Sequence, residues 1–139
     1  MNDTAIKLVT TLHKAVFRAS NGKLLNLGSG MPVLMLTTTG RKSGQPRETM
    51  LTSPLQDGDK VMLVASKGGD DRNPAWFLNL RENPAVTVMM GGRTRHMTAH
   101  VADPAEKAGL WARIIADHDN YAGYQAKTER DIPVVVLEP

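Results

Sequence analysis

The stretch that decides the fold is Thr37-Thr38-Thr39-Gly40-Arg41-Lys42-Ser43-Gly44-Gln45-Pro46-Arg47, a tight turn between two apolar, strand-like segments. It carries three cations, Arg41, Lys42 and Arg47, which is more positive charge than a turn requires. Its glycines allow a ligand to approach the backbone closely, and free backbone amides in such turns bind anions. The stretch therefore predicts an anion-binding turn in a β-hairpin. A solvated hairpin turn is the alternative that these residues alone leave open.

The composition is that of a single globular domain. The chain has 139 residues, of which 41% are hydrophobic and 22% charged, so it can bury a core of its own. It contains no cysteine, which excludes a disulfide framework, thiol catalysis and Cys-ligated metal. The net charge of +3 favours anionic small molecules. Since only 4% of the residues are aromatic and no extended basic stripe is present, we expect no nucleic-acid partner.

The N-terminal part of the chain bears on where the protein resides. No apolar run approaches the ~20 residues that span a bilayer, and no signal-peptide pattern is present, so we expect a cytoplasmic protein. Residues 5–19 have the spacing of an amphipathic helix, which we expect to pack on the core as a lid. A peripheral position on the inner face of the membrane is the alternative for this helix. We divide the chain into residues 1–30, a helix and flexible lead-in, and a main domain over residues 31–139.

Hydrophobic alternation in the main domain predicts six strands, over residues 33–39, 47–55, 60–66, 85–90, 94–102 and 133–137. The first three form an antiparallel meander. Asn73-Pro74 predicts the N-cap and first turn of a short helix that ends before Asn83-Pro84. Asp103 predicts a carboxylate cap for a further helix. Because hairpins dominate and no βαβ alternation is present, the class is α+β, with a small closed or half-open β-barrel of mostly antiparallel strands.

Familiar catalytic patterns are absent from the sequence. His96 and His100 lie four residues apart in a strand-like run, where their Cα atoms are about 13 Å apart, so we expect no metal site. The chain has no G-x-S-x-G motif, and the segment from Gly40 to Gly44 lacks the Walker pattern. What remains is the basic turn and a second glycine-rich loop, Ala65-Ser66-Lys67-Gly68-Gly69. An anion-binding turn, a second glycine-rich loop and few reactive side chains indicate a protein that borrows its chemistry from a cofactor. A flexible connection is the alternative for the second loop.

Four segments together resemble the deazaflavin-dependent nitroreductase and quinone reductase family: TTTGRKSGQPR at 37–47, VASKGG at 64–69, NPAWFLNLRENP at 73–84 and RDIPVVVLEP at 130–139. The resemblance covers about residues 31–139. It implies a split β-barrel that binds coenzyme F-420, an 8-hydroxy-5-deazaflavin with a phosphate and an acidic oligoglutamate tail.

The family pattern also implies roles for individual residues at the cofactor. Arg41, Lys42, Arg47 and Lys67 would hold the phosphate and the acidic tail. Ser66 and the amides near Gly68 would border the deazaflavin ring. Trp76 would cover the cofactor groove, although it is equally well explained as a core anchor. Asn79 would add a polar contact, with capping of its own helix as the alternative.

The acceptor side is implied by a second group of residues. Tyr121, Tyr124 and His118 would line the acceptor pocket and supply a proton to the reduced product; packing on one helical face is the alternative for the two tyrosines. Members of the family often carry tyrosine where this chain has His118, and proline near Met50-Leu51. These two departures bear on the choice of acceptor and on the floor of the pocket.

The resemblance thus implies an oxidoreductase that transfers a hydride from reduced coenzyme F-420 to a quinone, an enone or a nitroaromatic. Its partner is a small-molecule hydride acceptor, and the chain is a monomer or weak homodimer. Two rivals stay open: an FMN-dependent split-barrel reductase, and a non-catalytic carrier of the coenzyme.

Overall fold

The computed structural model describes residues 14, 15, 17, 18, 27, 28 and 30–139. Most of the helix expected over residues 5–19, and most of the lead-in over 1–30, lie outside the described residues. Among the residues described, no helix is long and apolar enough to cross a membrane. The strands are β1 (Leu27–Gly28), β2 (Met31–Thr39), β3 (Pro46–Thr52), β4 (Leu55–Asp57), β5 (Lys60–Val64), β6 (Ala85–Met90), β7 (Arg93–Val101) and β8 (Val134–Glu138). The helices are η1 (Lys67–Gly69), α2 (Ala75–Glu82), α3 (Pro104–Asp117) and α4 (Asn120–Ala126).

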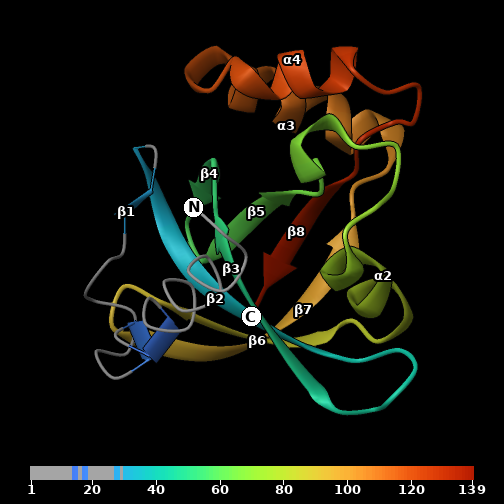
Figure 1. Cartoon of the computed structure of the whole chain (residues 1–139). Coiled ribbons are helices and arrows are strands. Elements are labelled where there is room, and N and C mark those ends of the chain that lie inside the picture. The colour runs from blue at the N-terminus through green and yellow to red at the C-terminus, as the bar shows by residue number, and fades with distance from the viewer. Residues whose placement is uncertain (1–13, 16, 19–26, 29) are drawn as a thin grey trace, which may run out of the picture.

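The strands form one curved, antiparallel sheet in the order β1-β2-β6-β7-β8-β5-β4, with β3 paired to the other edge of β2 (Figure 1). The α+β class is confirmed. The expected count of six strands is wrong, because the described part of the chain has eight. The sheet is not closed, since β3 and β4 are not paired to each other. The expected meander is also wrong in part, because β5 pairs with β8 rather than with β3.

The strand expected over residues 47–55 is interrupted at Ser53-Pro54, and the interruption has a structural role. The backbone N–H of Ser53 still donates to the carbonyl of Pro32 at 3.0 Å, and proline follows, which removes the next ladder donor. The fully buried Ser53 hydroxyl lies 2.7 Å from the carbonyl of Met62 on β5 and 3.0 Å from that of Leu55 on β4. It also accepts from Gln56 Nε2 at 2.9 Å. One side chain therefore bridges the gap between the β3 and β4–β5 parts of the open sheet.

The main core lies inside the curve of the sheet. Alternate residues of β2, Leu34 and Leu36, point inward together with the buried side chains Val61, Leu63, Val86, Val88, Met97, Ala99, Val135 and Leu137. Helix α2 completes this core with Trp76, Phe77 and Leu80. Burial of large apolar side chains contributes about 1.5–3 kcal/mol each, so α2 is held firmly against the sheet.

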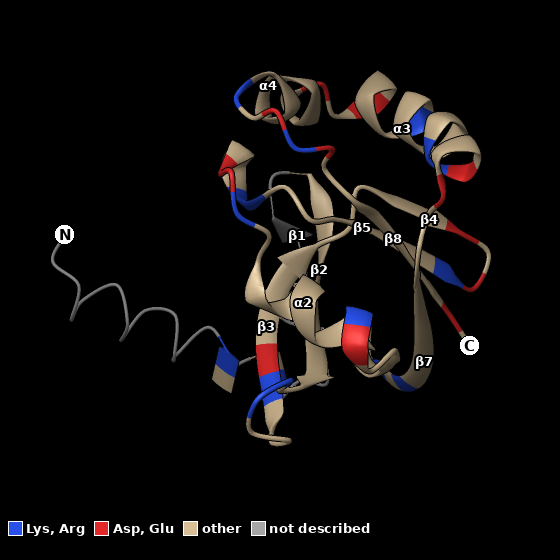
Figure 2. Ribbon diagram, turned by 90° about the vertical axis from the view of Figure 1, so that its right-hand side faces the viewer, with Lys and Arg blue, Asp and Glu red and all other residues tan. Residues whose placement is uncertain are grey.

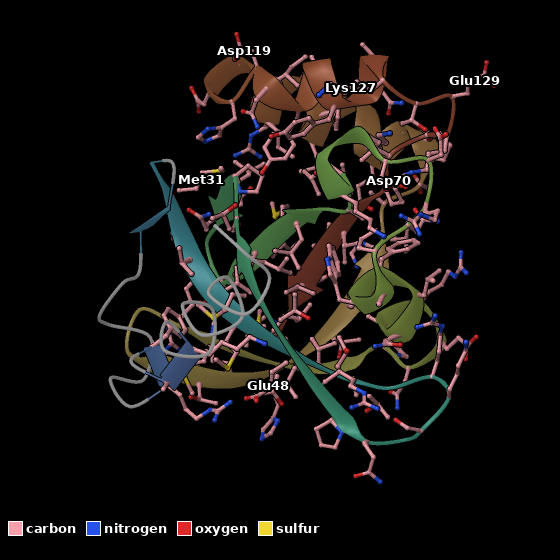
Figure 3. The ribbon with its side chains drawn as sticks, in the orientation of Figure 1. Met31, Glu48, Asp70, Asp119, Lys127 and Glu129 are labelled. Carbon is pink, nitrogen blue, oxygen red and sulfur yellow. The ribbon has the colours of Figure 1, made fainter. Side chains whose placement is uncertain are left out.

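Two helices cover one end of the sheet. Helices α3 and α4 pack over a second cluster, in which Ile114 and Tyr121 contact Met31 and Val134 (Figures 1 and 3). The Asp103 cap is confirmed, because its carboxylate accepts from the backbone N–H of Glu106 at 2.8 Å. The carboxylate of Glu106 in turn lies 3.0 Å from His100 Nε2, which ties α3 to β7.

The start of α2 differs from the sequence prediction. Pro74 occupies the N-cap position, and no side chain caps the helix. Asn73, the expected cap, instead accepts a hydrogen bond from Arg130 Nη1 at 3.0 Å. A long-range guanidinium contact has therefore replaced the local capping bond, which the local sequence could not reveal. The expected end of this helix is confirmed at Asn83.

Replacing Ser53 with alanine tests the bridge across the open sheet. The substitution removes the hydroxyl donor at a buried carbonyl, so we expect the free energy of unfolding to fall by about 1–3 kcal/mol. Urea unfolding followed by circular dichroism measures the change. Thr98→Ala, at an exposed threonine on β7, is the matched control and is expected to change stability by less than about 0.5 kcal/mol. Equal effects of the two substitutions would contradict the bridge.

Candidate functional site

The turn between β2 and β3 is rigid although its side chains are exposed. Gly40 N–H donates to Gln45 O and Gly44 N–H donates to Gly40 O, both at 2.8 Å. A Cβ at position 40 would lie 2.7 Å from Ser43 Oγ, so a side chain there would displace the Ser43 hydroxyl. Ser43 Oγ also accepts from Arg47 Nη2 at 3.1 Å. The backbone thus holds the turn in one shape while it presents its cations.

Asn79 on α2 fixes the same turn from the core side. Its amide oxygen accepts from the backbone N–H of Arg41 at 3.2 Å and from Arg41 Nη1 at 2.9 Å. Its Nδ2 donates to the buried hydroxyl of Thr38 at 3.2 Å. Asn79 is itself buried. The side chain therefore does not cap its own helix, as one sequence interpretation held, but positions the basic turn.

The basic turn forms one wall of a pocket of about 360 Å³. Its lining residues are Gly40, Arg41, Lys42, Ser43, Arg47, Glu48, Thr49, Ala75, Trp76 and Asn79. Figure 2 shows positive residues concentrated in this connection beside β3. Glu48 is the one carboxylate of the lining, and it pairs with Arg18. Three cations against one paired carboxylate make this an electropositive pocket, which we call the cationic pocket.

A second pocket, of about 600 Å³, lies between the sheet and α4. It is lined by Met31, Leu51, Thr52, Val64, Ser66, Lys67, Gly68, Pro74, Trp76, Asn120, Tyr121 and Tyr124. Its volume falls in the range of small-molecule sites. Trp76 lines this pocket, which we call the ring pocket, as well as the cationic pocket. Trp76 is therefore common to the linings of the two pockets, and it also belongs to the main core.

The loop at the end of β5 supplies three residues to the ring pocket. Ser66 is in the right-handed region, and Lys67, Gly68 and Gly69 follow at φ of 46°, 63° and 88°. Lys67 is the one residue other than glycine at positive φ in the described part of the chain. A right-handed residue followed by a left-handed one turns successive N–H groups to the same side, which is the conformation of anion-binding backbone nests.

Helix α4 supplies the tyrosines. The rings of Tyr121 and Tyr124 pack edge to face with centroids 5.8 Å apart. Tyr121 is buried, and its hydroxyl lies 3.6 Å from Met31 Sδ. Burial raises the pKa of the Tyr121 phenol above its ordinary value of 10, although a hydrogen bond with Thr52 acts in the opposite direction. The Tyr121 hydroxyl therefore stays protonated at neutral pH.

His118 is not with the two tyrosines in the lining of the ring pocket. It follows α3 at the C-cap position, where its backbone N–H donates to Ile114 O at 2.9 Å. Of the three residues that the sequence grouped together, Tyr121 and Tyr124 line this pocket. The His118 carbonyl accepts from the backbone N–H of Tyr121 at 3.4 Å at the start of α4.

The two histidines of β7 have protein partners. His96 Nδ1 lies 3.3 Å from Thr87 Oγ1, and His100 contacts Glu106 and Glu138 at 3.0 and 3.1 Å. Within the described residues, no group of three or more His, Asp or Glu side chains could hold a metal ion. These histidines serve as cross-strand and helix-to-sheet contacts.

Several residues of the site were missed from the sequence. Met31, Thr52, Val64 and Asn120 line the ring pocket because the fold brings β2, β3, β5 and α4 together. Arg130 was quoted only as part of a motif, yet its guanidinium bonds to the backbone beside Ser66. Arg130 stands in the polar run Lys127-Thr128-Glu129-Arg130-Asp131, so nothing in the local sequence distinguishes it from its neighbours.

The chain is similar to proteins of one enzyme family. A model of the F420H(2)-dependent quinone reductase family matches residues 9–139. An F420H(2)-dependent quinone reductase of Mycobacterium tuberculosis is 44% identical over 130 residues, 91% of this chain and 87% of that protein. A solved F420-H2 dependent reductase, FDR-A, superposes with a TM-score of 0.69 at 39% identity, covering 77% of this chain and 94% of its own. Another structure, described as a domain-swapped dimer, has a TM-score of 0.72 at 33% identity over 96% of this chain and 99% of its own.

Titration of Tyr121 should appear in the stability of the protein at high pH. The folded state holds the proton of the Tyr121 phenol more tightly than the unfolded chain does. The protonated phenol therefore makes its full contribution to the free energy of unfolding below about pH 10, and this contribution is lost as the pH rises through the raised pKa of the folded state. We expect the free energy of unfolding to fall above about pH 10, and to fall less steeply in Tyr121→Phe. Urea unfolding at a series of pH values measures both slopes. Tyr124→Phe is the control and should keep the steeper slope; identical slopes in all three proteins would refute the assignment.

Proposed function

The chain belongs to the F420H(2)-dependent quinone reductase family, and from that premise we propose how its own residues perform the reaction. The protein is an oxidoreductase that uses reduced coenzyme F-420 as the hydride donor and a quinone-type small molecule as the acceptor. The residues that bind the coenzyme and the acceptor are the subject of the proposal. The single observation on which the proposal rests is that Trp76 lines both the cationic pocket and the ring pocket.

The chemistry of the cationic pocket fits the anionic end of the coenzyme. A phosphate followed by carboxylates requires several donors with positive charge, and Arg41, Lys42 and Arg47 supply them from one rigid turn. Arg47 is already bonded to Ser43 and Arg41 to Asn79, so these two guanidinium groups are held in place before a ligand arrives. Lys42 makes no hydrogen bond or ion pair with the described residues, and its ammonium can follow a flexible tail.

The ring pocket fits the deazaflavin and an acceptor beside it. Trp76 supplies an aromatic wall, and Ser66, Lys67 and Gly68 supply backbone and side-chain donors along the opposite loop. Asn79 supports the turn rather than the ring, since its amide oxygen accepts two hydrogen bonds from Arg41 and its Nδ2 donates to Thr38. We therefore assign Asn79 as a positioning residue for the cationic pocket, in place of the direct contact that the sequence suggested.

When bound, the reduced deazaflavin supplies a hydride from its carbon 5. The protein's part is to orient the two reactants, and holding reacting atoms about 3–3.5 Å apart can contribute roughly 7–11 kcal/mol. Tyr121 and Tyr124 border the space left for the acceptor, and α4 shields it from water. The Tyr121 hydroxyl is protonated at neutral pH, so it can donate a hydrogen bond to the oxygen of a reduced quinone. His118 lies outside this lining, so we give it no direct part.

The finer description of the fold is also a proposal. An open antiparallel sheet that curves around one core, with its gap bridged by Ser53, supports a split β-barrel. We retain a cytoplasmic location. Membrane contact through residues 5–19 falls largely outside the described residues and has no support in the fold.

Binding measurements test the assigned cations. Lys42→Ala and Arg47→Ala each remove a charged donor, so we expect each to weaken the binding of coenzyme F-420 by about 1–3 kcal/mol, roughly 5- to 160-fold in Kd. Titration of the coenzyme's fluorescence measures the affinity. Arg93→Ala, an exposed arginine of β7 outside both pockets, is the control and should leave Kd unchanged.

The same titration separates the rival functions. An FMN-dependent reductase would bind FMN more tightly than coenzyme F-420 and would be insensitive to loss of Lys42. A non-catalytic carrier would bind the reduced coenzyme but would not oxidise it when offered a quinone such as menadione. Unchanged affinity in both Lys42→Ala and Arg47→Ala would remove the basic turn from the site.

We also propose that the chain forms a homodimer. A relative 33% identical over nearly the whole chain is described as a domain-swapped dimer. In the described residues, β3 and β4 each pair on one side only, which leaves two strand edges available to a second copy. We expect analytical ultracentrifugation at micromolar concentration to give twice the chain mass of 15.1 kDa. A mass that stays at one chain over the whole concentration range would refute the dimer.

A further inference from the structure

Arg130 lies in the connection between α4 and β8, and its guanidinium is almost fully engaged by the chain. Its Nε donates to Asp70 O at 2.8 Å and its Nη1 to Asn73 Oδ1 at 3.0 Å. Its Nη2 donates to the carbonyls of Ala65 and Ser66 at 3.1 and 2.9 Å. A guanidinium has five N–H donors in a fixed planar fork, and the Arg130 side chain makes four hydrogen bonds with them.

The acceptors of Arg130 bracket one loop. Ala65 and Ser66 stand at its beginning, Asp70 at its end, and Asn73 just before α2. Between them the backbone runs through the left-handed conformations of Lys67, Gly68 and Gly69, and this conformation is unfavourable for Lys67 because it has a Cβ atom. A loop that contains such a residue needs contacts from outside to keep its shape.

The other side of the loop is confined by α4. A Cβ at Gly69 would lie only 2.8 Å from the carbonyl oxygen of Tyr124, so the backbone packs directly against the helix that carries the pocket tyrosines. Lys127, labelled in Figure 3, stands at the same contact, because its Cβ would be 3.0 Å from that added atom. The loop is therefore held between Arg130 and α4.

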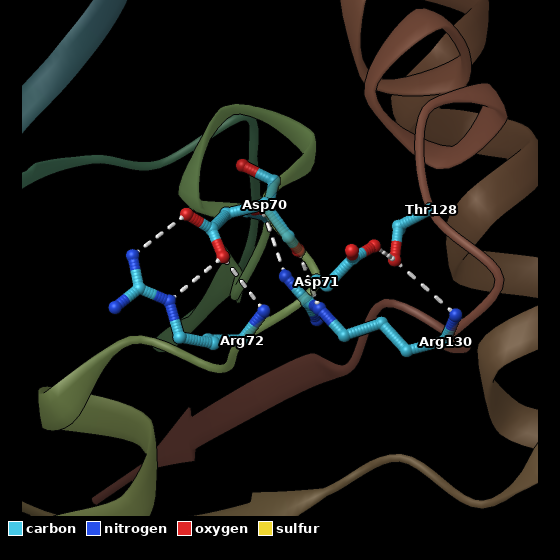
Figure 4. Close-up of polar contacts among 6 residues, drawn as sticks. Asp70, Asp71, Arg72, Thr128 and Arg130 are labelled. Carbon is cyan, nitrogen blue, oxygen red and sulfur yellow. Dashed lines mark hydrogen bonds and ion pairs between the residues drawn. The ribbon is translucent and has the colours of Figure 1, made fainter.

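Arg130 is itself fixed by its neighbours. Its backbone N–H donates to Thr128 Oγ1 at 3.3 Å, and the Thr128 hydroxyl donates to Asp71 Oδ1 at 2.9 Å (Figure 4). Its carbonyl accepts from Gln125 Nε2 at 2.7 Å, and Gln125 Oε1 accepts from the backbone N–H of Ile132 at 2.9 Å. These bonds fix the Arg130 backbone to α4 and to the segment that leads into β8, and so fix the point from which its side chain extends to the loop.

Arg130 does not line the ring pocket, whereas Ser66, Lys67 and Gly68 do. We propose that Arg130 is a positioning residue, which holds the 66–70 loop in the shape that seats the cofactor ring. The part of this inference that concerns the cofactor rests on the proposed function. The part that concerns the loop does not, because it is a property of the protein without a ligand.

Arg72 offers a matched comparison within the same loop. It is exposed, and among the described residues its guanidinium bonds only to Asp70, two residues away, through Nε and Nη2 at 3.1 Å (Figure 4). Through these hydrogen bonds Arg72 lowers the pKa of the Asp70 carboxyl to about 2. Arg72 therefore bonds to the side-chain carboxylate of Asp70, whereas Arg130 bonds to its backbone carbonyl. Only Arg130 fixes the backbone of the loop through its guanidinium.

The experiment compares Arg130→Lys and Arg130→Met with Arg72→Lys and Arg72→Met. The first readout is amide hydrogen exchange of residues 66–70 in the protein without cofactor. We expect exchange to rise about tenfold or more in Arg130→Met and less in Arg130→Lys, whose ammonium keeps three donors but lacks the planar fork that reaches all four acceptors. We expect changes below about twofold in the Arg72 variants, and none in the amides of β2 and β6 in any variant.

The second readout is the Kd of coenzyme F-420, which we expect to rise about tenfold in Arg130→Met, to rise less in Arg130→Lys and to stay unchanged in the Arg72 variants. Unchanged exchange of the loop in both Arg130 variants overturns the proposal. Faster exchange with unchanged affinity also overturns it, because the loop would then not seat the cofactor. Should Arg130→Met fail to fold, Arg130→Lys decides by the same criteria. If the wild-type protein takes up no coenzyme, the proposed function fails while the exchange data still decide whether Arg130 holds the loop.

Discussion

The packing of α2 inside the curve of the sheet is the contact on which the rest of the molecule depends. Phe77 and Leu80 fill the core between β2 and β7, and Trp76 closes it toward the surface. Burial of each of these side chains contributes a few kcal/mol to stability. Because protein interiors are closely packed, the three side chains together also fix the position of α2 against the sheet. Because α2 carries Trp76 and Asn79, the same packing sets the wall shared by both pockets and the position of the basic turn.

The two loops that line the pockets are each held by a polar side chain from another element: Asn79 lines the cationic pocket itself, and Arg130 lines neither pocket. Asn79 holds the basic turn through a backbone N–H, and Arg130 holds the glycine-rich loop through backbone carbonyls. In each case a buried or half-buried polar group from a distant element fixes the backbone, and the exposed residues of the loop are left free to meet a ligand. This division explains how exposed loops can present charge in a defined geometry.

Local patterns in the sequence predicted much of the fold. The strands β2, β5, β6, β7 and β8, the Asp103 cap and the end of α2 at Asn83 follow from alternation and capping rules, and all were found within about two residues of their expected bounds. The order of the strands could not be predicted this way, because the pairing of β5 with β8 joins segments about 70 residues apart. Asn73 failed as a cap for a related reason, since its partner Arg130 is distant in sequence. At the site, the cations were found from their density in one turn, whereas Met31 and Asn120 belong to the ring pocket only through tertiary structure.

Lys67 is a long, charged side chain on a backbone conformation that favours glycine. A residue branched at Cβ, such as valine or threonine, would clash there more severely than lysine does, and asparagine or glycine would be accommodated with little strain. Few substitutions are therefore compatible with the loop at this position. Lys67 can be replaced by glycine or asparagine with the backbone unchanged, whereas a residue branched at Cβ would strain it. Substitutions that change the volume of the ring pocket are accordingly expected at its other lining residues rather than at Lys67.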